Sequence, residues 1–527
     1  MSHIPPDWDN PYSWPRIPLL SANAVATSQP LAAQSGLRAL LQGGNAVDAA
    51  VAAAITLAVV EPASNGIGSD AHALIWDGRA LHGLNGSGRA PGAWTPEAFP
   101  GGMPVRGWNS VTVPGCVSAW RSLSQRFGRL PFERLFDSAI DYARRGFLVS
   151  PKVAEYWAQQ TAELCTQPGF AHAFLRNGRA PAPGELFSFP AQADALEEIA
   201  VSRGDSFYLG SQAARLVAHG QAHGGLLSEA DLASHRSDWV APLAMEYRGY
   251  SLHELPPSTQ GIVALIALGI LAQQDVRSHP VDSAGSLHLQ IEALKLAFAD
   301  AWSRVGDTDR MPAEAAELLD PEYLRARSRM IDHRRAQVFG PTGPQRGGTV
   351  ALTTADANGM MVSYIQSNCH GFGSGIVVDG ISLHNRGCDF TTRRDHPNCV
   401  GPSKRPYHTL MPGFVTKAGQ PVLAMSFMGG SMQPQSHVQI LVRIADYGQS
   451  PQAACDAPRF RVADGLTVQV EHGLTPQALD GLRSRGHNIT EIPRHGDLFG
   501  WGQIVWKLSD GYLTAGDPRC DGQAVGF

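Results

Sequence analysis

The sequence lacks features that mark several large classes of protein. Its seven cysteines are odd in number and scattered along 527 residues, with no C-x-x-C pair and no Cys/His pair at zinc spacing. They predict reduced thiols, with neither a disulfide framework nor a structural metal. Basic and acidic side chains, 42 and 47, nearly balance, and no basic stripe is present that could bind nucleic acid.

Segments that direct a chain to a membrane are also missing. Residues Met1–Arg16 contain no basic stretch followed by an apolar one, which a secretory signal requires. The longest apolar run, Ala46–Val60, is shorter than a bilayer span and contains Asp48. We therefore expect a soluble protein of the cytoplasm that has no membrane partner.

Local signals predict strands and helices in alternation from Ala24 onward. A strand at Ala24 precedes a helix that begins near Pro30 and stops at paired glycines. A second, buried helix is capped by Asn45, and Ala71–Trp76 form a strand. The region from about 108 to 335 is expected to be mainly helical. The length allows two to four domains, or one large layered domain.

Motifs of several enzyme classes are absent. No serine lies at the centre of G-x-S-x-G, and the chain has no Walker A sequence, no H-E-x-x-H and no dinucleotide fingerprint after a first strand. The glycine-rich run Gly371–Gly375 has strand-like flanks, whereas a phosphate loop lies between a strand and a helix. This run therefore does not favour nucleotide binding.

A change of composition at Gly340–Gly348 divides the chain. This stretch, GPTGPQRGG, predicts a mobile loop. Thr349–Thr354 and Met360–Ser367 then predict a hairpin around the turn that ends at Gly359. A threonine therefore opens a strand directly after flexible glycines.

Thr349 is a candidate nucleophile because a chain-terminal threonine carries its own general base, the free α-amine. Attack of its hydroxyl on the preceding carbonyl, followed by hydrolysis of the ester, would create such a terminus. The glycine at 348 leaves that carbonyl unobstructed. Taken alone, the Gly-Gly-Thr sequence is equally compatible with an ordinary strand residue after a loop.

The sequence from Ala24 to Phe527 resembles the γ-glutamyltransferase family of N-terminal-nucleophile (Ntn) hydrolases. The motifs that carry the resemblance are GGNAVDAAVAA (Gly43–Ala53), EPASNGIGSDA (Glu61–Ala71), GRAPGAWTPEAF (Gly88–Phe99), VPGCVSAW (Val113–Trp120), GGTVALTTADANG (Gly347–Gly359), FGSGIV (Phe372–Val377), KRPYHT (Lys404–Thr409), MGGSMQPQ (Met428–Gln435) and DAPRF (Asp456–Phe460). The resemblance implies an α/β (α+β) fold, the four-layer αββα sandwich of Ntn hydrolases with an additional helical region.

The resemblance also implies processing and catalytic roles. A proenzyme would be cut between Gly348 and Thr349 into an α chain, residues 1–348, and a β chain, residues 349–527. The two chains would form one interwoven domain as a heterodimer. Two such heterodimers could associate further. Thr349 would be the nucleophile, and Ser367 would hydrogen-bond it. The N–H groups of Gly429 and Gly430 would stabilise the oxyanion, with no metal or organic cofactor.

Further residues match the family's substrate-binding positions. Asp389 matches an acidic residue that grips the substrate's α-amino group in the transferases. His408 and Thr409 stand where two serines bind the α-carboxylate. The family has an asparagine near this hairpin, and in this sequence its position is shifted, with Asn368 in the same region. The resemblance thus implies that all four contact the substrate.

Two arginines depart from the transferase pattern. Ser87 replaces the arginine that binds the glutamyl carboxylate, and Arg89, two residues later, projects from the same face of an extended segment. Arg386 replaces a glutamine. With His408 in place of a serine, these changes predict a smaller, more positive pocket. Structural ion pairs would explain both arginines equally well. His408 could likewise be an ordinary core histidine, and Asp389 a structural carboxylate.

Three functions follow from this reading. The preferred one is a self-cleaving hydrolase of a small carboxylate-bearing amide, in the oxamate amidohydrolase branch of the family. It would convert oxamate to oxalate and ammonia in the degradation of purine- or urate-derived nitrogen. The second is a γ-glutamyltransferase or glutathione hydrolase. The third is a non-catalytic homologue, which would fail to process.

Overall fold

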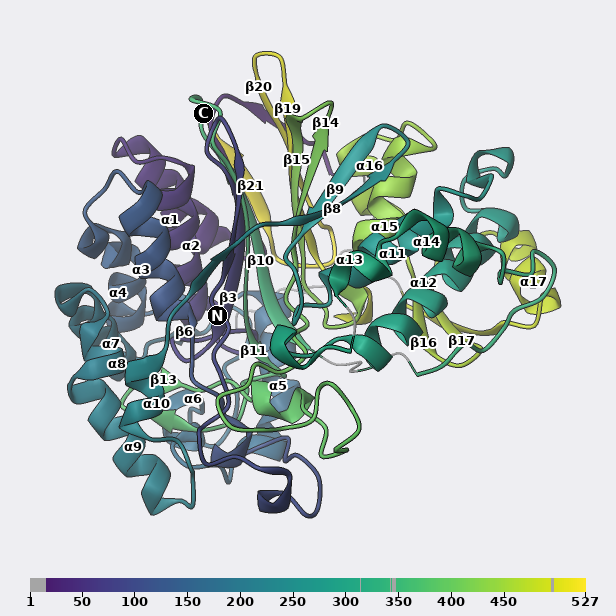
Figure 1. Ribbon diagram of the computed structural model, residues 1–527. Helices are drawn as coiled ribbons and strands as arrows, with labels where there is room; N and C mark the ends of the chain where they lie inside the picture. The colour runs from purple at the N-terminus through teal and green to yellow at the C-terminus, as the bar shows by residue number, and fades with distance from the viewer. Residues whose placement is uncertain (1–15, 313, 342, 344–346, 494–496) are drawn as a thin grey trace, which may run out of the picture.

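Two β-sheets stand face to face in the centre of the protein, and helices cover their outer faces (Figure 1). The computed structural model describes residues 16–312, 314–341, 343, 347–493 and 497–527. Two predicted features lie wholly or partly outside the described residues. They are the N-terminal segment predicted to carry no signal, of which residues 1–15 are not described, and part of the predicted loop at 340–348. The αββα layering predicted by the resemblance is confirmed.

Seven strands form each of the two large sheets, and neighbouring strands are antiparallel throughout. The first sheet has the order β21 (Gln523–Gly526), β2 (Ala24–Thr27), β10 (Gly348–Ala355), β11 (Met361–Cys369), β3 (Asp70–Trp76), β4 (Leu81–Asn85) and β7 (Asp238–Val240). The second has the order β1 (Leu19–Ser21), β20 (Gly511–Gly516), β19 (Gly502–Leu508), β15 (Gln420–Phe427), β14 (Pro412–Lys417), β9 (Tyr250–Glu254) and β8 (Leu243–Tyr247).

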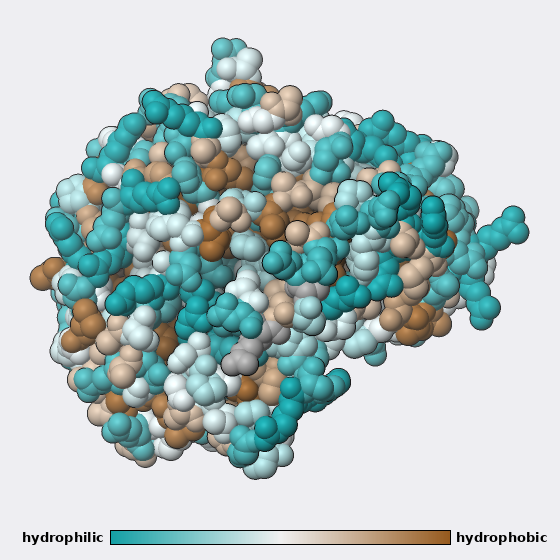
Figure 2. Space-filling view, in the orientation of Figure 1, coloured by the Kyte–Doolittle hydropathy of each residue, from teal (hydrophilic) through white to brown (hydrophobic). Residues whose placement is uncertain are grey.

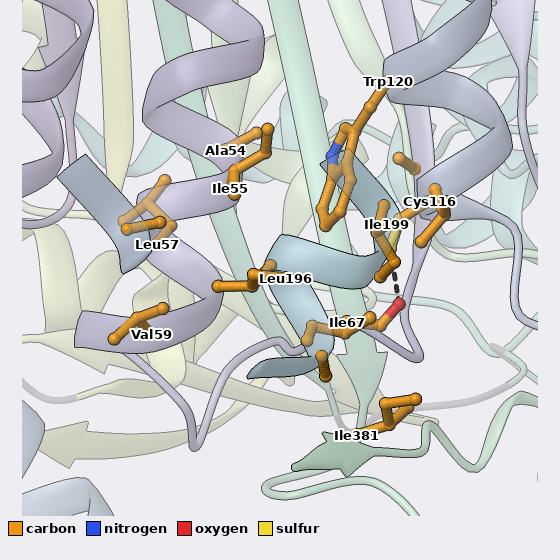
Figure 3. Packing of buried hydrophobic residues seen from close by; sticks show 14 of the residues in the cluster. Ala54, Ile55, Leu57, Val59, Ile67, Cys116, Trp120, Leu196, Ile199 and Ile381 are labelled. Atoms are coloured by element: carbon orange, nitrogen blue, oxygen red, sulfur yellow. Dashed lines mark hydrogen bonds between the residues drawn. The ribbon is translucent and has the colours of Figure 1, made fainter. Parts of the chain in front are cut away.

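The first sheet is covered by helices that lie on the left in Figure 1. They and their neighbours are α1 (Pro30–Leu41), α2 (Ala46–Val60), α3 (Cys116–Phe127), α4 (Asp137–Arg145), α5 (Pro151–Leu164), α6 (Phe170–Phe174), α7 (Pro190–Ser202), α8 (Asp205–Leu209), α9 (Ser211–Ala222) and α10 (Glu229–Ser234). Figure 3 shows their packing, in which Ile55 and Leu57 of α2 lie near Leu196 of α7. The dashed line there joins the Cys116 thiol to the carbonyl of Ile67, 2.9 Å away.

Helices on the right in Figure 1 cover the second sheet. They are α11 (Gly261–Leu271), α12 (Ala284–Arg304), α13 (Ala315–Leu318), α14 (Pro321–Ser328), α15 (Met432–Ala445), α16 (Pro451–Asp456) and α17 (Pro476–Ser484). A small sheet of β16 (Phe460–Asp464), β17 (Thr467–Glu471) and β18 (Asn488–Ile492) lies beside them. Figure 2 shows hydrophilic residues over most of this face of the molecule. None of the described helices has the length and apolarity needed to cross a bilayer.

Helix α2 is fixed at its first turn by side chains from distant parts of the chain. The side chain of Asn45 accepts hydrogen bonds from the N–H groups of Val47 and Asp48, and Asp48 accepts one from Asn45 N–H, which completes a capping box. Asp356, in the turn after β10, accepts a further bond from Ala46 N–H at 2.9 Å. This contact joins the helix to the end of the strand that carries the candidate nucleophile.

Residues on both sides of position 348 contribute to both large sheets. In the first sheet, β10 lies between β2 and β11, and the C-terminal strand β21 pairs with β2 on its other edge. Apolar side chains from both sheets meet between them, among them Leu74, Met361, Phe414 and Val505. The parts before and after residue 348 therefore share one core.

The predicted elements largely match the structure, with one clear difference. The helices expected from Pro30 and after Asn45, the strand ending at Trp76 and the 349–367 hairpin are present. Within the region expected to be mainly helical, however, residues 238–254 form β7, β8 and β9. These strands have only three to five residues, and β7 and β8 lie at sheet edges, so they carry little of the apolar alternation that identifies a strand.

Replacing Asn45 with alanine should lower the free energy of unfolding by about 1–2 kcal/mol, because two N–H groups at the start of α2 lose their acceptor. Chemical denaturation of the uncleaved protein would measure the change. Gln42→Ala, at an exposed position three residues earlier, is the control and should leave the midpoint unchanged. Equal midpoints for both variants would contradict the capping role.

Candidate active site

Thr349 lies at the start of β10 with its side chain only 1% exposed. The pairing with β11 is irregular at this point, since Gly348 pairs with Cys369 and Val350 with Gln366. Strand β11 thus carries one extra residue across the interval, which forms a bulge. The bulge coincides with the peptide bond predicted to be cleaved.

Ser367 connects the candidate nucleophile to that bond. The Thr349 hydroxyl donates to Ser367 Oγ at 3.2 Å, and Ser367 Oγ donates to the carbonyl oxygen of Gly348 at 2.5 Å. Ser367 Oγ also accepts bonds from the N–H of Cys369 at 2.7 Å and from Arg386 Nη2 at 3.2 Å. Because these donors point at Ser367 Oγ, its own proton is directed to the carbonyl, which it polarises.

Arg386 is wholly buried beside this group. Its Nη1 donates to Asp389 Oδ2 and to Thr409 Oγ1, each at 2.8 Å. Burial acts to lower the pKa of Arg386, but electrostatic interactions with Cys369 and Asp389 raise it above the ordinary value, so the guanidinium stays charged. A fixed cation therefore lies two hydrogen bonds from the Thr349 hydroxyl and neutralises Asp389.

Gly429 and Gly430 lie between β15 and α15 with φ angles of +119° and +59°, which favour glycine. Their carbonyls accept from the N–H groups of Met432 and Gln433 at the start of the helix. Across the described residues their own N–H groups have no acceptor. A Cβ placed on Gly347 would lie 2.8 Å from Gly430 N, so the chain before Thr349 passes directly against Gly430.

Gln260, at the start of α11, holds the glycine pair against the rest of the site. Its Nε2 donates to the carbonyl oxygens of Thr409, at 2.5 Å, and of Gly430, at 2.8 Å. The sequence analysis missed this residue, because a glutamine outside the recognised motifs gives no signal. It links Thr409, on the Arg386 side, to the candidate oxyanion donors.

His408 faces a buried carboxylate on β3. Leu410 N–H donates to His408 Nδ1, so Nε2 carries the proton and donates to Asp70 Oδ2 at 3.0 Å. Burial, followed by the charge of Arg386, lowers the pKa of His408 well below its ordinary value. Burial also raises the pKa of Asp70, to about 7. Asp70 on β3 pairs with Ser367 on β11, so the Asp70–His408 contact lies next to the strand that holds Ser367 against Thr349.

Two other predicted substrate-binding residues have partners elsewhere. The Asn368 side chain accepts a bond from Ser69 Oγ at 2.8 Å and donates to the carbonyl of Pro62, which ties the end of β11 to the loop before β3. Arg89 bonds to Asp307 at 3.1 Å, and its side chain is 42% exposed. The structure does not join either residue to Thr349 by a hydrogen bond, and a role in substrate binding stays a prediction for both.

Two cavities adjoin the site. One, of about 440 Å³, is bordered by Gly347, Gly429 and the charged side chains of Arg106 and Arg461. The other, of about 780 Å³, is bordered by Asp389 and by apolar side chains such as Trp302 and Phe390. His370 borders both, so a molecule bound in either cavity lies near the end of β11.

A further group beside the site was not anticipated from the sequence. Cys369 and His370 follow one another at the end of β11, and Cys388 and Asp389 follow one another in the 3-10 turn η6 (Arg386–Asp389). Each offers one ligand atom, and the four atoms lie within 4.8 Å of one another. The two pairs are far apart in the sequence and match no metal-binding spacing, so only the fold reveals the group.

Taken together, the geometry suits attack by a hydroxyl on a carbonyl. Thr349 is the candidate nucleophile, and Ser367 contacts both it and the adjoining peptide carbonyl. Within the part of the chain that the structure describes, the N–H groups of the glycine pair have no acceptor, as the candidate oxyanion donors should. Arg386 adds a fixed positive charge at the same place.

Comparison with known proteins agrees with this geometry. Residues 32–527 match the sequence model of the Gamma-glutamyltranspeptidase family. The crystal structure of cephalosporin acylase from Bacillus halodurans covers the whole chain at 43% identity, with 99% of that chain covered and a TM-score of 0.95.

Two curated relatives are similar over nearly their full length. The glutathione hydrolase-like YwrD proenzyme of Bacillus subtilis (strain 168) is 36% identical, with 95% of this chain and 98% of the relative covered. The oxamate amidohydrolase proenzyme of Klebsiella pneumoniae is 35% identical, with 94% and 97% covered.

Replacing Ser367 with alanine should slow cleavage of the chain by about 10²–10³-fold, because the Gly348 carbonyl loses its hydrogen-bond donor. The rate at which two chains appear on a denaturing gel measures the effect. Ser367→Thr keeps the hydroxyl and should cleave. Ser363→Ala, on the same strand but bonded to Met425, is the control. Cleavage of Ser367→Ala at the unmodified rate would rule out this role.

Proposed function

This chain belongs to the gamma-glutamyltranspeptidase family and is a hydrolase of amide bonds, and we propose that it cuts itself between Gly348 and Thr349 and then hydrolyses a small carboxylate-bearing amide. Oxamate is the substrate we favour, with oxalate and ammonia as products. The relatives are named as proenzymes, which supports processing into two chains that remain together.

Self-cleavage begins with attack of Thr349 Oγ on the carbonyl carbon of Gly348. The hydrogen bond from Ser367 stabilises the negative charge that develops on the carbonyl oxygen. The C–N bond then breaks, the acyl group moves to Oγ as an ester, and the nitrogen becomes the free amine of Thr349. Water hydrolyses the ester, which leaves a carboxylate on Gly348 and restores the hydroxyl.

The processed site then repeats this chemistry on a substrate. The Thr349 amine, with an ordinary pKa of about 7.7–8.0, takes the hydroxyl proton as Oγ attacks the amide carbonyl. The N–H groups of Gly429 and Gly430 hold the oxyanion once Gly347, which lies against Gly430 in the uncleaved chain, has moved away. The protonated amine gives its proton to the leaving ammonia, and water releases the acid from the ester.

The observation that carries the substrate proposal is the buried contact between Arg386 and Asp389. A carboxylate gripping an α-ammonium group must be free to do so, whereas Asp389 is already paired at 2.8 Å. The guanidinium, in contrast, reaches Ser367 beside the nucleophile. It suits a substrate whose carboxylate is attached directly to the scissile carbonyl, as in oxamate.

The fit around Gly348 supports a small acyl group. The ester formed in self-cleavage is an acyl-enzyme whose acyl residue is Gly348. A Cβ added there would lie 3.1 Å from Tyr156 Oη and 3.2 Å from Gly371 N, tighter than ordinary contact. The surroundings therefore leave little room beyond glycine next to the scissile carbonyl.

A second candidate function is hydrolysis of a larger amide, either a γ-glutamyl compound or an acylated cephalosporin. The cavity of about 780 Å³ beside Asp389 is large enough for such an acyl group. The names of two relatives, a glutathione hydrolase-like proenzyme and a cephalosporin acylase, point the same way.

Replacing Thr349 with alanine should leave the chain whole and inactive, because the nucleophile for both reactions is lost. Intact-mass measurement of the purified protein gives the readout. Thr353→Ala, a buried threonine on the same strand, is the matched control and should still cleave. Two chains from Thr349→Ala would overturn the cleavage site. One uncleaved band from the folded, unmodified protein would favour a non-catalytic homologue.

Replacing Arg386 with glutamine should lower kcat/KM for oxamate by about 10²-fold or more, since a carboxylate loses its cation. Turnover of a γ-glutamyl anilide should rise in the same variant, because Asp389 is freed. Ammonia release and anilide release measure the two activities on processed enzyme. Arg89→Gln tests the other predicted arginine and should change the ratio of the two activities little.

Two outcomes would reverse the preference for oxamate. If the unmodified enzyme turns over glutathione well and leaves oxamate untouched, the γ-glutamyl alternative holds. If Arg89→Gln abolishes oxamate hydrolysis while Arg386→Gln retains it, the substrate carboxylate lies on the Arg89 side of the site.

A further inference from the structure

The cluster formed by Cys369, His370, Cys388 and Asp389 has the shape of a metal site. The two thiol sulfurs are 4.0 Å apart, and Cys388 Sγ is 4.0 Å from His370 Nε2. Cys369 Sγ lies 3.5 Å from Asp389 Oδ2. Ligands in a tetrahedral zinc site are separated by about 3.4–3.8 Å, given bonds of about 2.3 Å to sulfur and about 2.0–2.2 Å to nitrogen or oxygen. All four ligand atoms lie within 4.8 Å of one another, so inward shifts of about 1 Å or less in these separations would bring them onto one ion.

Asn385 holds the two ligand pairs together. Its side-chain oxygen accepts a bond from His370 N–H at 3.0 Å, and its own N–H donates to the carbonyl of Asn368, at 3.1 Å. Its side-chain nitrogen donates to the carbonyl of Val105 at 2.7 Å. The end of β11 and the turn that carries Cys388 are thereby fixed relative to one another.

The site is reachable from outside and its charges balance. His370, Cys388 and Asp389 border the cavity of about 780 Å³. Two thiolates, a carboxylate and a neutral imidazole around a divalent ion carry one net negative charge, and Arg386 supplies one positive charge 2.8 Å from Asp389. Two sulfur ligands and one imidazole select a soft or borderline ion over Mg²⁺ or Ca²⁺.

We propose that these four residues bind one Zn²⁺ ion, and that the bound ion inhibits the enzyme. The ion would replace the protons of two thiols and take Asp389 Oδ2, the atom to which Arg386 now donates. Arg386 would then lose the partner that aligns it beside Ser367, and the ion would carry positive charge into the space next to Thr349. The inhibitory effect rests on the proposed function, whereas binding of the ion does not.

Binding is tested first, on full-length Thr349→Ala protein, which needs no activity. Zn²⁺ affinity is measured by competition with a chromophoric chelator, and Co²⁺ serves as a spectroscopic stand-in. We expect one ion per chain and a thiolate-to-Co²⁺ charge-transfer band. Cys388→Ser and His370→Ala should each weaken binding by about 100-fold or more and remove or shift the band.

Cys399→Ser is the matched control, since Cys399 is also partly exposed and lies outside the cluster. It should bind Zn²⁺ as the unmodified protein does. Absence of stoichiometric binding, or equal losses from Cys399→Ser and Cys388→Ser, would overturn the proposal. The use of two ligand variants guards against misfolding of either one.

Inhibition is tested on processed enzyme with whichever amide it hydrolyses. The readout is the ratio of activity with and without Zn²⁺ for each variant. We choose a Zn²⁺ concentration that lowers the activity of the unmodified enzyme and of Cys399→Ser at least tenfold. At this concentration Cys388→Ser should lose much less of its activity. If binding is confirmed but all three respond alike, the ion is not an inhibitor at this site. If no amide is hydrolysed, the proposed function fails while the binding result stands.

Discussion

The structure depends on the placing of β10 between β2 and β11 in the first sheet. Backbone hydrogen bonds on both edges fix the strand that begins with Thr349, while α2 and the second sheet enclose it. A cut after Gly348 leaves intact the pairings of β10 from Val350 onward with β11 and from Leu352 onward with β2. The candidate nucleophile could therefore become a chain terminus and keep its position, which the proposed chemistry requires.

Burial of Arg386 is the second constraint. A charge in the interior must be matched locally, and Asp389, Ser367 and Thr409 provide the match. The near-neutral chain as a whole does not attract anions, so the proposed selectivity for a carboxylate would have to come from local cations such as Arg386. His408 is hydrogen-bonded to Asp70 nearby, and because burial lowers the pKa of His408 well below its ordinary value, this histidine adds no further positive charge to the site.

Much of the fold could be predicted from the sequence, whereas the partners of individual side chains could not. Caps, glycine stops and apolar runs identified α1, α2 and the β10–β11 hairpin because those signals are local. The short strands β7–β9 were missed because three to five residues carry little pattern. Thr349, Ser367 and the glycine pair followed from motifs. Gln260 and the Cys369–Cys388 cluster could not, because only tertiary folding brings such distant residues together.

Gly347 lies against Gly430 in the uncleaved chain, where a Cβ on Gly347 would be 2.8 Å from Gly430 N. If the chain cuts itself after Gly348 as proposed, the segment before the cut would occupy this part of the site until cleavage frees it. A newly folded molecule would then be latent, and hydrolysis of other amides would begin only after its own cleavage. The activity of a preparation would therefore depend on the age of its molecules as well as on their number.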